Sequence, residues 1–180
     1  MKYGRIPMSS ERFIIDTDTL ITPYRLFYPF DMFPDFWNFI EQKIKSKEIK
    51  ILDMVYNEIT KGGDELSDWL SAIANIELTD RKNGTIITHY SSILNYIHNS
   101  PFYKTEALNT WSTATIADPW LIAAALTHSY TIITFEKSNA GLSDKHPSKN
   151  AKIPDVCSQF NVRCENLYYM MRGLGFKRTF

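Results

Sequence analysis

The feature that most constrains the fold is an alternation of short apolar runs with longer segments of helical periodicity. Runs rich in β-branched residues occupy residues 13–15, 49–52, 130–135 and 162–164, and a weaker one occupies residues 75–78. Each run is bounded by polar residues and has the length of a strand buried on both faces. Short buried strands that alternate with helices are typical of a parallel sheet covered on both sides. We therefore predict an α/β fold.

The segments between the runs carry helix signals. Apolar residues recur every three or four positions in the segments that begin at Phe33, Asp64 and Thr85. The strongest signal is ADPWLIAAALTHS, residues 117–129, which opens with an acid and a proline and continues through alanines. A last helix is expected in NLYYMMRGLGF, residues 166–176, ended by its two glycines.

Length and charge limit the classes of protein that fit. The chain has 180 residues and 44% hydrophobic content, enough for one substantial core, so residues 1–180 are predicted to form a single domain with residues 1–11 as an N-terminal extension. The 20 basic residues balance the 20 acidic ones, so any surface for nucleic acid must be local. The longest apolar run, residues 120–126, is far shorter than the roughly 18 residues that span a bilayer, and no signal peptide is evident. We expect a soluble, cytoplasmic protein with no membrane partner.

Acidic residues recur at the ends of the expected strands or at the starts of the helices that follow. In open α/β sheets ligands bind outside the carboxyl ends of the strands, so these acids should share one edge. Taken singly, Asp118 and Asp155 are explained by helix capping and Glu58 by a solvated helix surface. Asp16 is harder to explain, because a carboxylate directly after a buried strand is costly to desolvate. The whole set comprises Asp16, Glu58, Asp118, Glu136 and Asp155.

Taken together, the five acids predict a metal site. Converging carboxylates repel one another, and they persist as anions only with a cation among them. Ligands that are all oxygen select a hard divalent ion, Mg²⁺ or Mn²⁺. The two cysteines and four histidines show no zinc-ligand spacing. An ion held this way positions a water and neutralises the charge of a phosphodiester.

The acidic segments also resemble a known family. DTD at residues 16–18, VYNEI at 55–59, ADPWLIAAAL at 117–126, TIITFE at 131–136 and KIPDVC at 152–157 follow the order of the acidic motifs of the PIN domain. The resemblance extends from about residue 13 to residue 175. YPFDMFPDFW, which begins at Tyr28, further resembles a PIN-like subfamily of prokaryotic toxin-type ribonucleases.

The resemblance implies a three-layer α/β/α fold whose central parallel sheet has about five strands in the order 3-2-1-4-5. It also implies an endoribonuclease that depends on Mg²⁺ or Mn²⁺. Asp16, Glu58 and Asp118 would be the catalytic, metal-holding residues, and Glu136 and Asp155 would complete the metal cluster directly or through water. Thr17 would orient the first carboxylate through its hydroxyl, in a shell of supporting residues that comprises Thr17, Asp18 and Thr134.

Two positions depart from the family pattern. Asp18 stands where the family commonly has Asn or Ser, and it adds a negative charge that either points away or tightens metal binding. Glu136 stands where the family commonly has Asp, and its extra methylene moves its oxygens outward. Direct ligation of the metal by Asp18 or Glu136 is therefore left open.

A basic segment lies between the last two proposed ligands. Residues 137–152 mix lysines with Gly, Ser and Asn, which fits either a long mobile surface loop or a flap that guides an RNA strand. Arg25 and the tail FKRTF, residues 176–180, are weaker candidates for phosphate contacts. The candidate RNA-binding residues, with the weaker candidate Arg25 included, are Arg25, Lys137, Lys145, Lys149 and Lys152.

By resemblance alone, the chain is expected to be the toxin of a type II toxin–antitoxin pair, with RNA as substrate and a cognate antitoxin as partner. A homodimer formed through the apolar 24–39 region has the same basis. The rival hypothesis is a PIN-like module that binds RNA or protein without cutting it. The neutral net charge favours this rival slightly, whereas the five acids weigh against it.

Two other families begin with a similar acidic string. Haloacid-dehalogenase phosphatases require DxDxTL with a nucleophilic first Asp, and DTDTL at residues 16–20 is one residue too short. An EF-hand loop requires Gly and Glu where Ile21 and Phe27 stand. Both alternatives are disfavoured.

Overall fold

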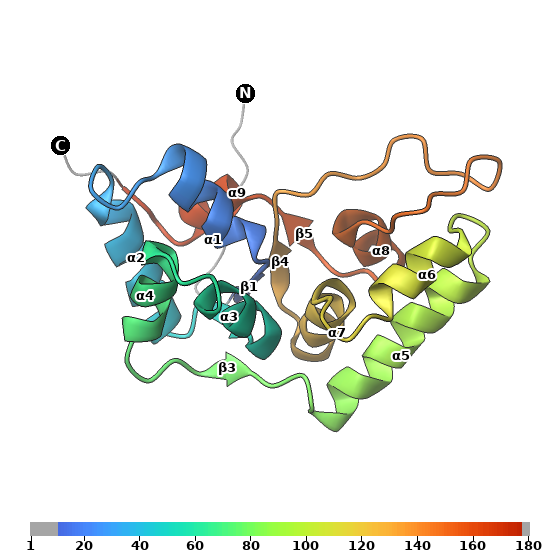
Figure 1. Cartoon of the computed structure of the whole chain (residues 1–180), viewed down its shortest axis with the longest axis horizontal. Helices are drawn as coiled ribbons and strands as arrows, with labels where there is room; N and C mark the ends of the chain where they lie inside the picture. Colours follow the sequence, from blue (N-terminus) through green and yellow to red (C-terminus); the bar gives the residue numbers. More distant parts are fainter. Residues whose placement is uncertain (1–10, 178–180) are drawn as a thin grey trace.

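The computed structural model describes residues 11–177 and contains one five-stranded sheet (Figure 1). The strand order is β3-β2-β1-β4-β5, and every neighbouring pair is parallel. The predicted α/β class and the 3-2-1-4-5 order are therefore confirmed. The strands are β1 (Phe13–Ile15), β2 (Ile49–Leu52), β3 (Leu78–Thr79), β4 (Thr131–Ile133) and β5 (Cys164–Glu165).

Helices cover both faces of the sheet, which gives the three-layer arrangement seen in Figure 1. The connections from β1 to β3 run in one direction and those from β3 to β5 in the other, so right-handed crossovers place their helices on opposite faces. One side carries α2 (Pro34–Lys45), α3 (Asp53–Thr60), α4 (Glu65–Ala72) and α9 (Leu167–Gly173). The other side carries α5 (Gly84–Asn99), α6 (Thr105–Trp111), α7 (Asp118–His128) and α8 (Ile153–Gln159).

Two parts of the core fix the elements that carry the acids. β1 is the central strand, and its three residues are at most 1% exposed. Asp16, the residue that follows this strand, is therefore also buried. α7 is apolar on nearly all sides, and Leu121, Ile122 and Ala123 are fully buried. A helix that is apolar all round runs through the interior. Its first residue is therefore held at the edge of the sheet.

Three helices were not predicted from the sequence: α1 (Asp18–Thr22), the π-helix η1 (Pro23–Phe27) and α6. Pro23 has no N–H and interrupts the α-helical ladder, and the next turn closes with a bond from the Tyr28 N–H to the Pro23 carbonyl, at 2.7 Å. The Thr19 hydroxyl donates to the Ile133 carbonyl at 2.7 Å and ties α1 to the end of β4. This tie places α1 over the carboxyl edge of the sheet.

Some strand boundaries differ from the predicted ones. The run at residues 75–78 becomes a strand only at Leu78–Thr79, and the last strand begins at Cys164 rather than Val162. α9 ends at Gly173 as predicted, and Gly175 has a φ of +77°, which suits glycine. Within residues 11–177, no helix has the length and apolar character required to cross a membrane. Nearly all of the predicted N-terminal extension, residues 1–10, lies outside the described residues.

Candidate active site

A pocket of about 200 Å³ lies at the carboxyl edge of the sheet, beside the ends of β1 and β4. Asp16 follows β1, Glu58 lies in the second turn of α3, Asp118 is the first residue of α7, and Glu136 follows β4. These four of the five predicted acids therefore meet from four separate elements. The full lining is Asp16, Thr17, Asp18, Ile21, Glu58, Thr115, Ile116, Ala117, Asp118 and Glu136.

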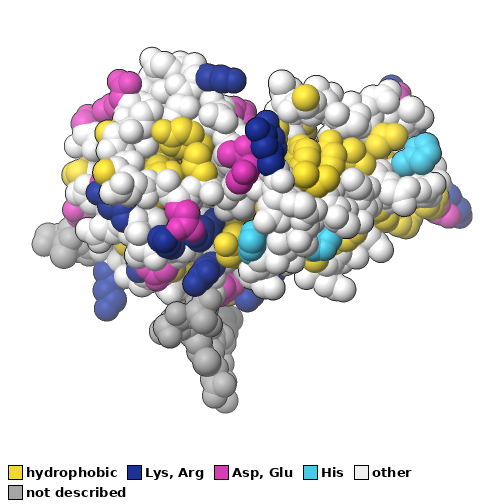
Figure 2. Space-filling model, turned by 90° about the horizontal axis from the view of Figure 1, so that it is seen from below, with side chains coloured by type: hydrophobic (Ala, Val, Ile, Leu, Met, Phe, Trp, Pro, Cys, Tyr) yellow, Lys and Arg dark blue, Asp and Glu magenta, His cyan; other side chains and the backbone are white. Residues whose placement is uncertain are grey.

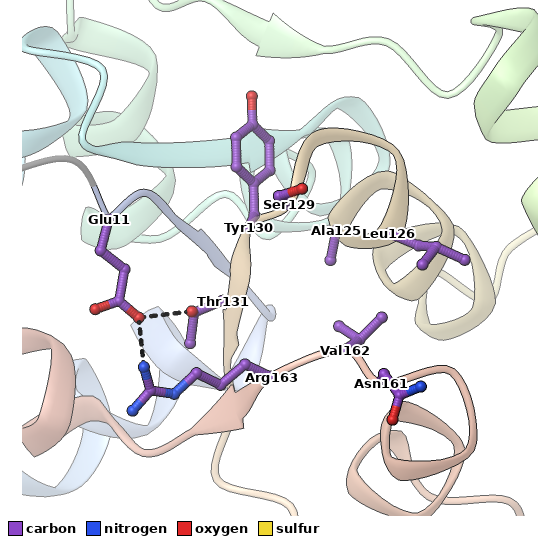
Figure 3. Close-up of a pocket in the computed structure, with 9 residues that line it drawn as sticks. All are labelled: Glu11, Ala125, Leu126, Ser129, Tyr130, Thr131, Asn161, Val162 and Arg163. Atoms are coloured by element: carbon purple, nitrogen blue, oxygen red, sulfur yellow. Dashed lines mark hydrogen bonds and ion pairs between the residues drawn. The ribbon is translucent and has the colours of Figure 1, made fainter.

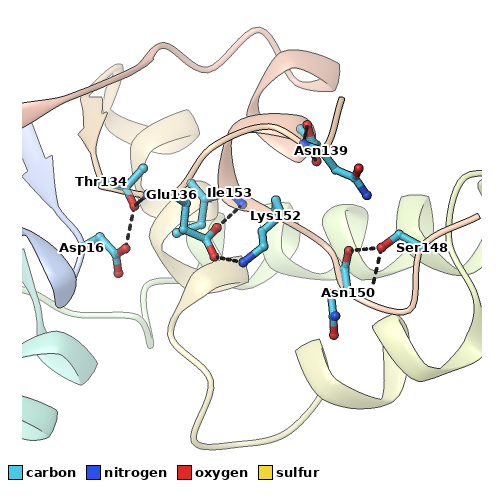
Figure 4. Close-up of polar contacts among 9 residues, drawn as sticks. Asp16, Thr134, Glu136, Asn139, Ser148, Asn150, Lys152 and Ile153 are labelled. Atoms are coloured by element: carbon cyan, nitrogen blue, oxygen red, sulfur yellow. Dashed lines mark hydrogen bonds and ion pairs between the residues drawn. The ribbon is translucent and has the colours of Figure 1, made fainter. Parts of the chain in front are cut away.

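Asp16 is the most buried acid of the pocket, with 7% exposure. The Thr17 backbone N–H donates to its Oδ1 at 2.8 Å, and the Thr134 hydroxyl donates to its Oδ2 at 2.8 Å (Figure 4). Both donors are neutral. The pKa of Asp16 is raised to about 7, first by burial and then by the charges of Asp118 and Asp18, while the hydrogen bonds from Thr134 and Thr17 oppose the rise. The ionised form of Asp16 is therefore energetically unfavourable near neutral pH.

Asp118 shares this electrostatic field. Its pKa is raised to about 6, first by burial and then by the nearby carboxylates of Glu136 and Glu58, while the Lys152 ammonium opposes the rise. Two carboxyl groups of one pocket therefore titrate near neutral pH. Perturbed acids in a concave site are a physical indication of function.

Glu58 is held by Thr17. The Thr17 hydroxyl donates to Glu58 Oε2 at 2.8 Å, across 41 residues of sequence. The family resemblance implied that this hydroxyl orients Asp16, and that prediction is wrong: Asp16 accepts a hydrogen bond from the Thr17 backbone N–H instead. Because Thr17 lies at the turn into α1, its amide and its side chain reach two different acids.

Glu136 has both carboxylate oxygens engaged (Figure 4). Lys152 Nζ lies 2.6 Å from Oε1, and the Ile153 backbone N–H donates to Oε2 at 2.8 Å. Ile153 is the first residue of α8, so Glu136 satisfies a free N–H at that helix start. Glu136 therefore forms one wall of the pocket, and Lys152 is paired with an acid.

Asp155 does not line the pocket. Its two oxygens accept the Asn139 backbone N–H at 3.2 and 3.1 Å, which ties the basic segment to α8. The same segment is also fixed at Ser148, whose N–H donates to the Phe102 carbonyl and whose carbonyl accepts the Lys104 N–H, both at 2.8 Å. Residues 137–152 form the long connection that extends over α8 and α6 in Figure 1. The mobility of this segment stays a prediction.

The other predicted RNA-binding residues are not gathered at the acids. Lys137 lines a neighbouring pocket that shares Glu136 with the acidic one. Nζ of Lys149 lies 3.5 Å from Oε1 of Glu106. Lys145 and Arg25 are exposed and line neither of these two pockets. In the tail, only Phe176 and Lys177 lie within the described residues.

The acidic pocket continues into a second cavity that the sequence analysis missed. This cavity, of about 520 Å³, shares Glu58, Thr115 and Ile116 with the acidic pocket and adds two cations, Lys61 and Arg81. Lys61 lies one helical turn after Glu58, and Arg81 comes two residues after β3. Both signals are visible in the sequence, because the strand-end rule applies to β3 as it does to β1.

The donor chemistry of the acidic pocket fits a hard divalent ion, since its charged groups are all carboxylates. In residues 11–177, however, no three His, Cys, Asp or Glu side chains are arranged to hold an ion as they stand. Asp16 and Asp118 fit best, because a cation would offset the burial and the repulsion that raise their pKa values. The exposed Glu58 could join them by leaving the Thr17 hydroxyl.

A different pocket, of about 390 Å³, lies at the opposite edge of the sheet (Figure 3). Its acid, Glu11, accepts the Thr131 hydroxyl at 2.7 Å and lies 3.3 Å from Nη1 of Arg163. The charge of Glu11 is therefore compensated. On the face shown in Figure 2, acidic and basic side chains are also intermixed, in keeping with the zero net charge of the chain.

Comparison with known proteins gives one match. Residues 13–178 match the model of the family described as "Domain of unknown function (DUF4411)". Neither the curated proteins nor the solved structures gave a match. The match covers nearly the whole chain, which therefore belongs to the DUF4411 family.

Proposed function

We propose that the protein is a metal-dependent endoribonuclease of PIN type. The observation that carries the proposal is that Asp16, Glu58 and Asp118, from three separate elements, line one pocket. Among residues 11–177, Asp16 has no cationic hydrogen-bond partner, and the pKa values of Asp16 and Asp118 are both raised by burial and by neighbouring acids. Such an arrangement is unfavourable alone and becomes favourable with a divalent cation.

Asp16, Asp118 and Glu58 would hold Mg²⁺ or Mn²⁺. When bound, the ion would polarise a water and neutralise charge on an RNA phosphodiester, leaving a 5′ phosphate and a 3′ hydroxyl. Thr134 and the Thr17 amide would keep Asp16 oriented, since each fixes one of its oxygens. Glu136, with both oxygens engaged, would act on the ion only through water.

Cleavage of single-stranded RNA by the purified protein tests the proposal. We expect cleavage with Mn²⁺ or Mg²⁺, no cleavage in excess chelator, and none by Asp118→Asn, which keeps the shape of the side chain. Wild-type activity in the Asp118→Asn protein would contradict the proposal.

One observation favours the non-catalytic alternative, a PIN-like module that binds RNA or protein. In the described part of the chain, no three acids are arranged to hold an ion as they stand. Under this alternative, RNA would bind and stay intact with every divalent cation tried, and Asp118→Asn would bind as tightly as the wild type.

The biological role that we propose is that of a toxin acting on cytoplasmic RNA and neutralised by a cognate antitoxin. Expression of the chain should arrest growth, and Asp118→Asn should not. The 24–39 region, proposed as a dimer surface, exposes Leu26, Phe27 and Met32, at 70%, 44% and 66%. Sedimentation of the wild type and of Leu26→Asp tests the dimer, because a dimer through this region should dissociate when a charge is introduced.

A further inference from the structure

The cavity next to the acidic pocket is a groove between α3 and residues 114–116. Lys61 directly follows α3 and lies one turn after Glu58, so the end of this helix presents an acid to both pockets and a cation to the second one. Thr115 and Ile116 line both pockets from the opposite wall. The two pockets are therefore neighbouring sections of one surface along the carboxyl edge of the sheet.

Lys61 differs from two lysines of the 137–152 segment, Lys149 and Lys152. Lys61 is exposed, and its ammonium has no ion-pair or hydrogen-bond partner among the described residues. Lys149 and Lys152, by contrast, are paired with Glu106 and Glu136. Lys61 is thus a cation that an incoming anion can use without first displacing a protein acid.

Arg81 is positioned by Asp53, the first residue of α3. Nη1 of Arg81 lies 3.3 Å from Asp53 Oδ2, and the Arg81 side chain remains 32% exposed. The other oxygen of Asp53, Oδ1, is buried and has no hydrogen-bond partner in the described structure. One carboxylate contact orients the guanidinium, and the remaining N–H groups of its fork are available for a ligand.

We infer that this groove is a phosphate-binding subsite, in which Lys61 and Arg81 hold a backbone phosphate of single-stranded RNA next to the phosphodiester at the acids. The inference rests on the proposed nuclease function and adds the residues that hold the substrate. A chain with zero net charge needs local cations for a polyanion, and these two line the cavity that shares Glu58 with the acidic pocket. Met54 and Ile116 form an apolar part of the groove wall, against which a base can pack.

The test is binding of a fluorescently labelled oligouridylate in excess chelator, so that no cleavage occurs. Lys61→Gln should weaken binding about three- to tenfold and Arg81→Gln about tenfold, as expected for charge-assisted contacts. The slope of log affinity against log salt concentration should become shallower by about 0.7 for each phosphate that the variant no longer neutralises. Lys82→Gln is the matched control, because Lys82 is an exposed neighbour of Arg81 that lines a different pocket.

Arg81→Gln removes the partner of Asp53 and can lower stability, whereas Lys61→Gln breaks no described contact. Lys61→Gln therefore keeps the test decisive. Wild-type affinity and salt slope in Lys61→Gln and in folded Arg81→Gln would overturn the inference. The proposed nuclease function is read separately, from metal-dependent cleavage and its loss in Asp118→Asn, so that either can fail while the other holds.

Discussion

The two edges of the sheet treat their carboxylates differently. At the amino edge, Glu11 accepts hydroxyl hydrogen bonds from Thr131 and Tyr169 and pairs with Arg163. At the carboxyl edge, the hydrogen-bond donors to Asp16 in the described part of the chain are neutral, and the neighbouring acid Asp118 adds to the effect of burial on the pKa of Asp16. The charge of Glu11 is compensated by the Arg163 guanidinium, whereas the donors to Asp16 carry no charge. Uncompensated charge of this kind is expected where a ligand supplies the missing cation.

The largest expected effect is the loss of activity in Asp118→Asn. Asp118 is one of the two pocket acids whose pKa values are raised. Its replacement should reduce cleavage by at least about a hundredfold, because a neutral amide binds a divalent cation poorly. The fold should remain, since the substitution also removes repulsion. Cleavage rates and far-UV circular dichroism measure the two effects.

Asp68→Asn is the control for that variant. Asp68 is likewise in the first turn of a helix, α4, but it is exposed and lies outside the acidic pocket. The cleavage rate of the Asp68→Asn protein should equal that of the wild type. Equal losses of cleavage in both variants would show that the effect is not specific to the acidic pocket.

The second prediction concerns stability against pH without divalent cations. The folded-state pKa of Asp16 is raised to about 7 from an ordinary value of 3.8, so between these values the folded protein binds more protons than the unfolded chain. Stability should therefore fall as pH rises from about 4 to 7, by on the order of 3 kcal/mol, and level off above 7.

Thermal melts across that range measure this dependence. Asp16→Asn should flatten the curve, and Mn²⁺ should raise the melting temperature most at the high-pH end. A stability that increases steadily from pH 4 to 7 in the wild type would show that Asp16 is compensated after all.

A smaller effect is expected from Thr134→Val. This variant removes the hydroxyl that donates to Asp16 Oδ2 and leaves the shape of the side chain nearly unchanged. We expect about a tenfold loss of cleavage and about 1 kcal/mol of stability, with the pKa of Asp16 raised further. Thr134→Ser, which restores the hydroxyl, should recover most of the activity; if it does not, the hydroxyl is not what matters.

The smallest effect is expected at the amino edge. Arg163→Gln removes an ion-pair partner of Glu11. Because the Arg163 side chain is 54% exposed, the free energy of unfolding should fall by less than about 1 kcal/mol. The cleavage rate should stay within about twofold of the wild type. A large loss of cleavage in Arg163→Gln would indicate that the amino edge takes part in the reaction, which would contradict the proposed active site at the carboxyl edge.

The sequence was most informative where local pattern and burial agree. FII at Phe13–Ile15 and IKIL at Ile49–Leu52 are strands as predicted, because parallel strands buried on both faces are rich in β-branched apolar residues. The one charged residue in these two strands, Lys50, pairs with Glu77. The strand-end rule brought Asp16, Glu58, Asp118 and Glu136 to one pocket. Topology places these acids at one edge, since parallel strands all end there.

What the sequence did not provide depends on contacts between distant residues. The pairing of Glu136 with Lys152, of Thr17 with Glu58 and of Arg81 with Asp53 follows from side-chain directions that no periodicity encodes. Asp155 has the same sequence signal as Asp118, an acid at a helix start, yet it bonds a loop amide outside the pocket. The π-turn at Pro23–Phe27 likewise depends on a single proline and its surroundings.

The most direct measurement is an anomalous difference map from crystals of the protein soaked in Mn²⁺. We expect a manganese peak bounded by the carboxylates of Asp16 and Asp118, with Glu58 turned toward it, and no peak at Glu11. A map without manganese among these three acids, from crystals in which they are ordered, would contradict the proposed metal site.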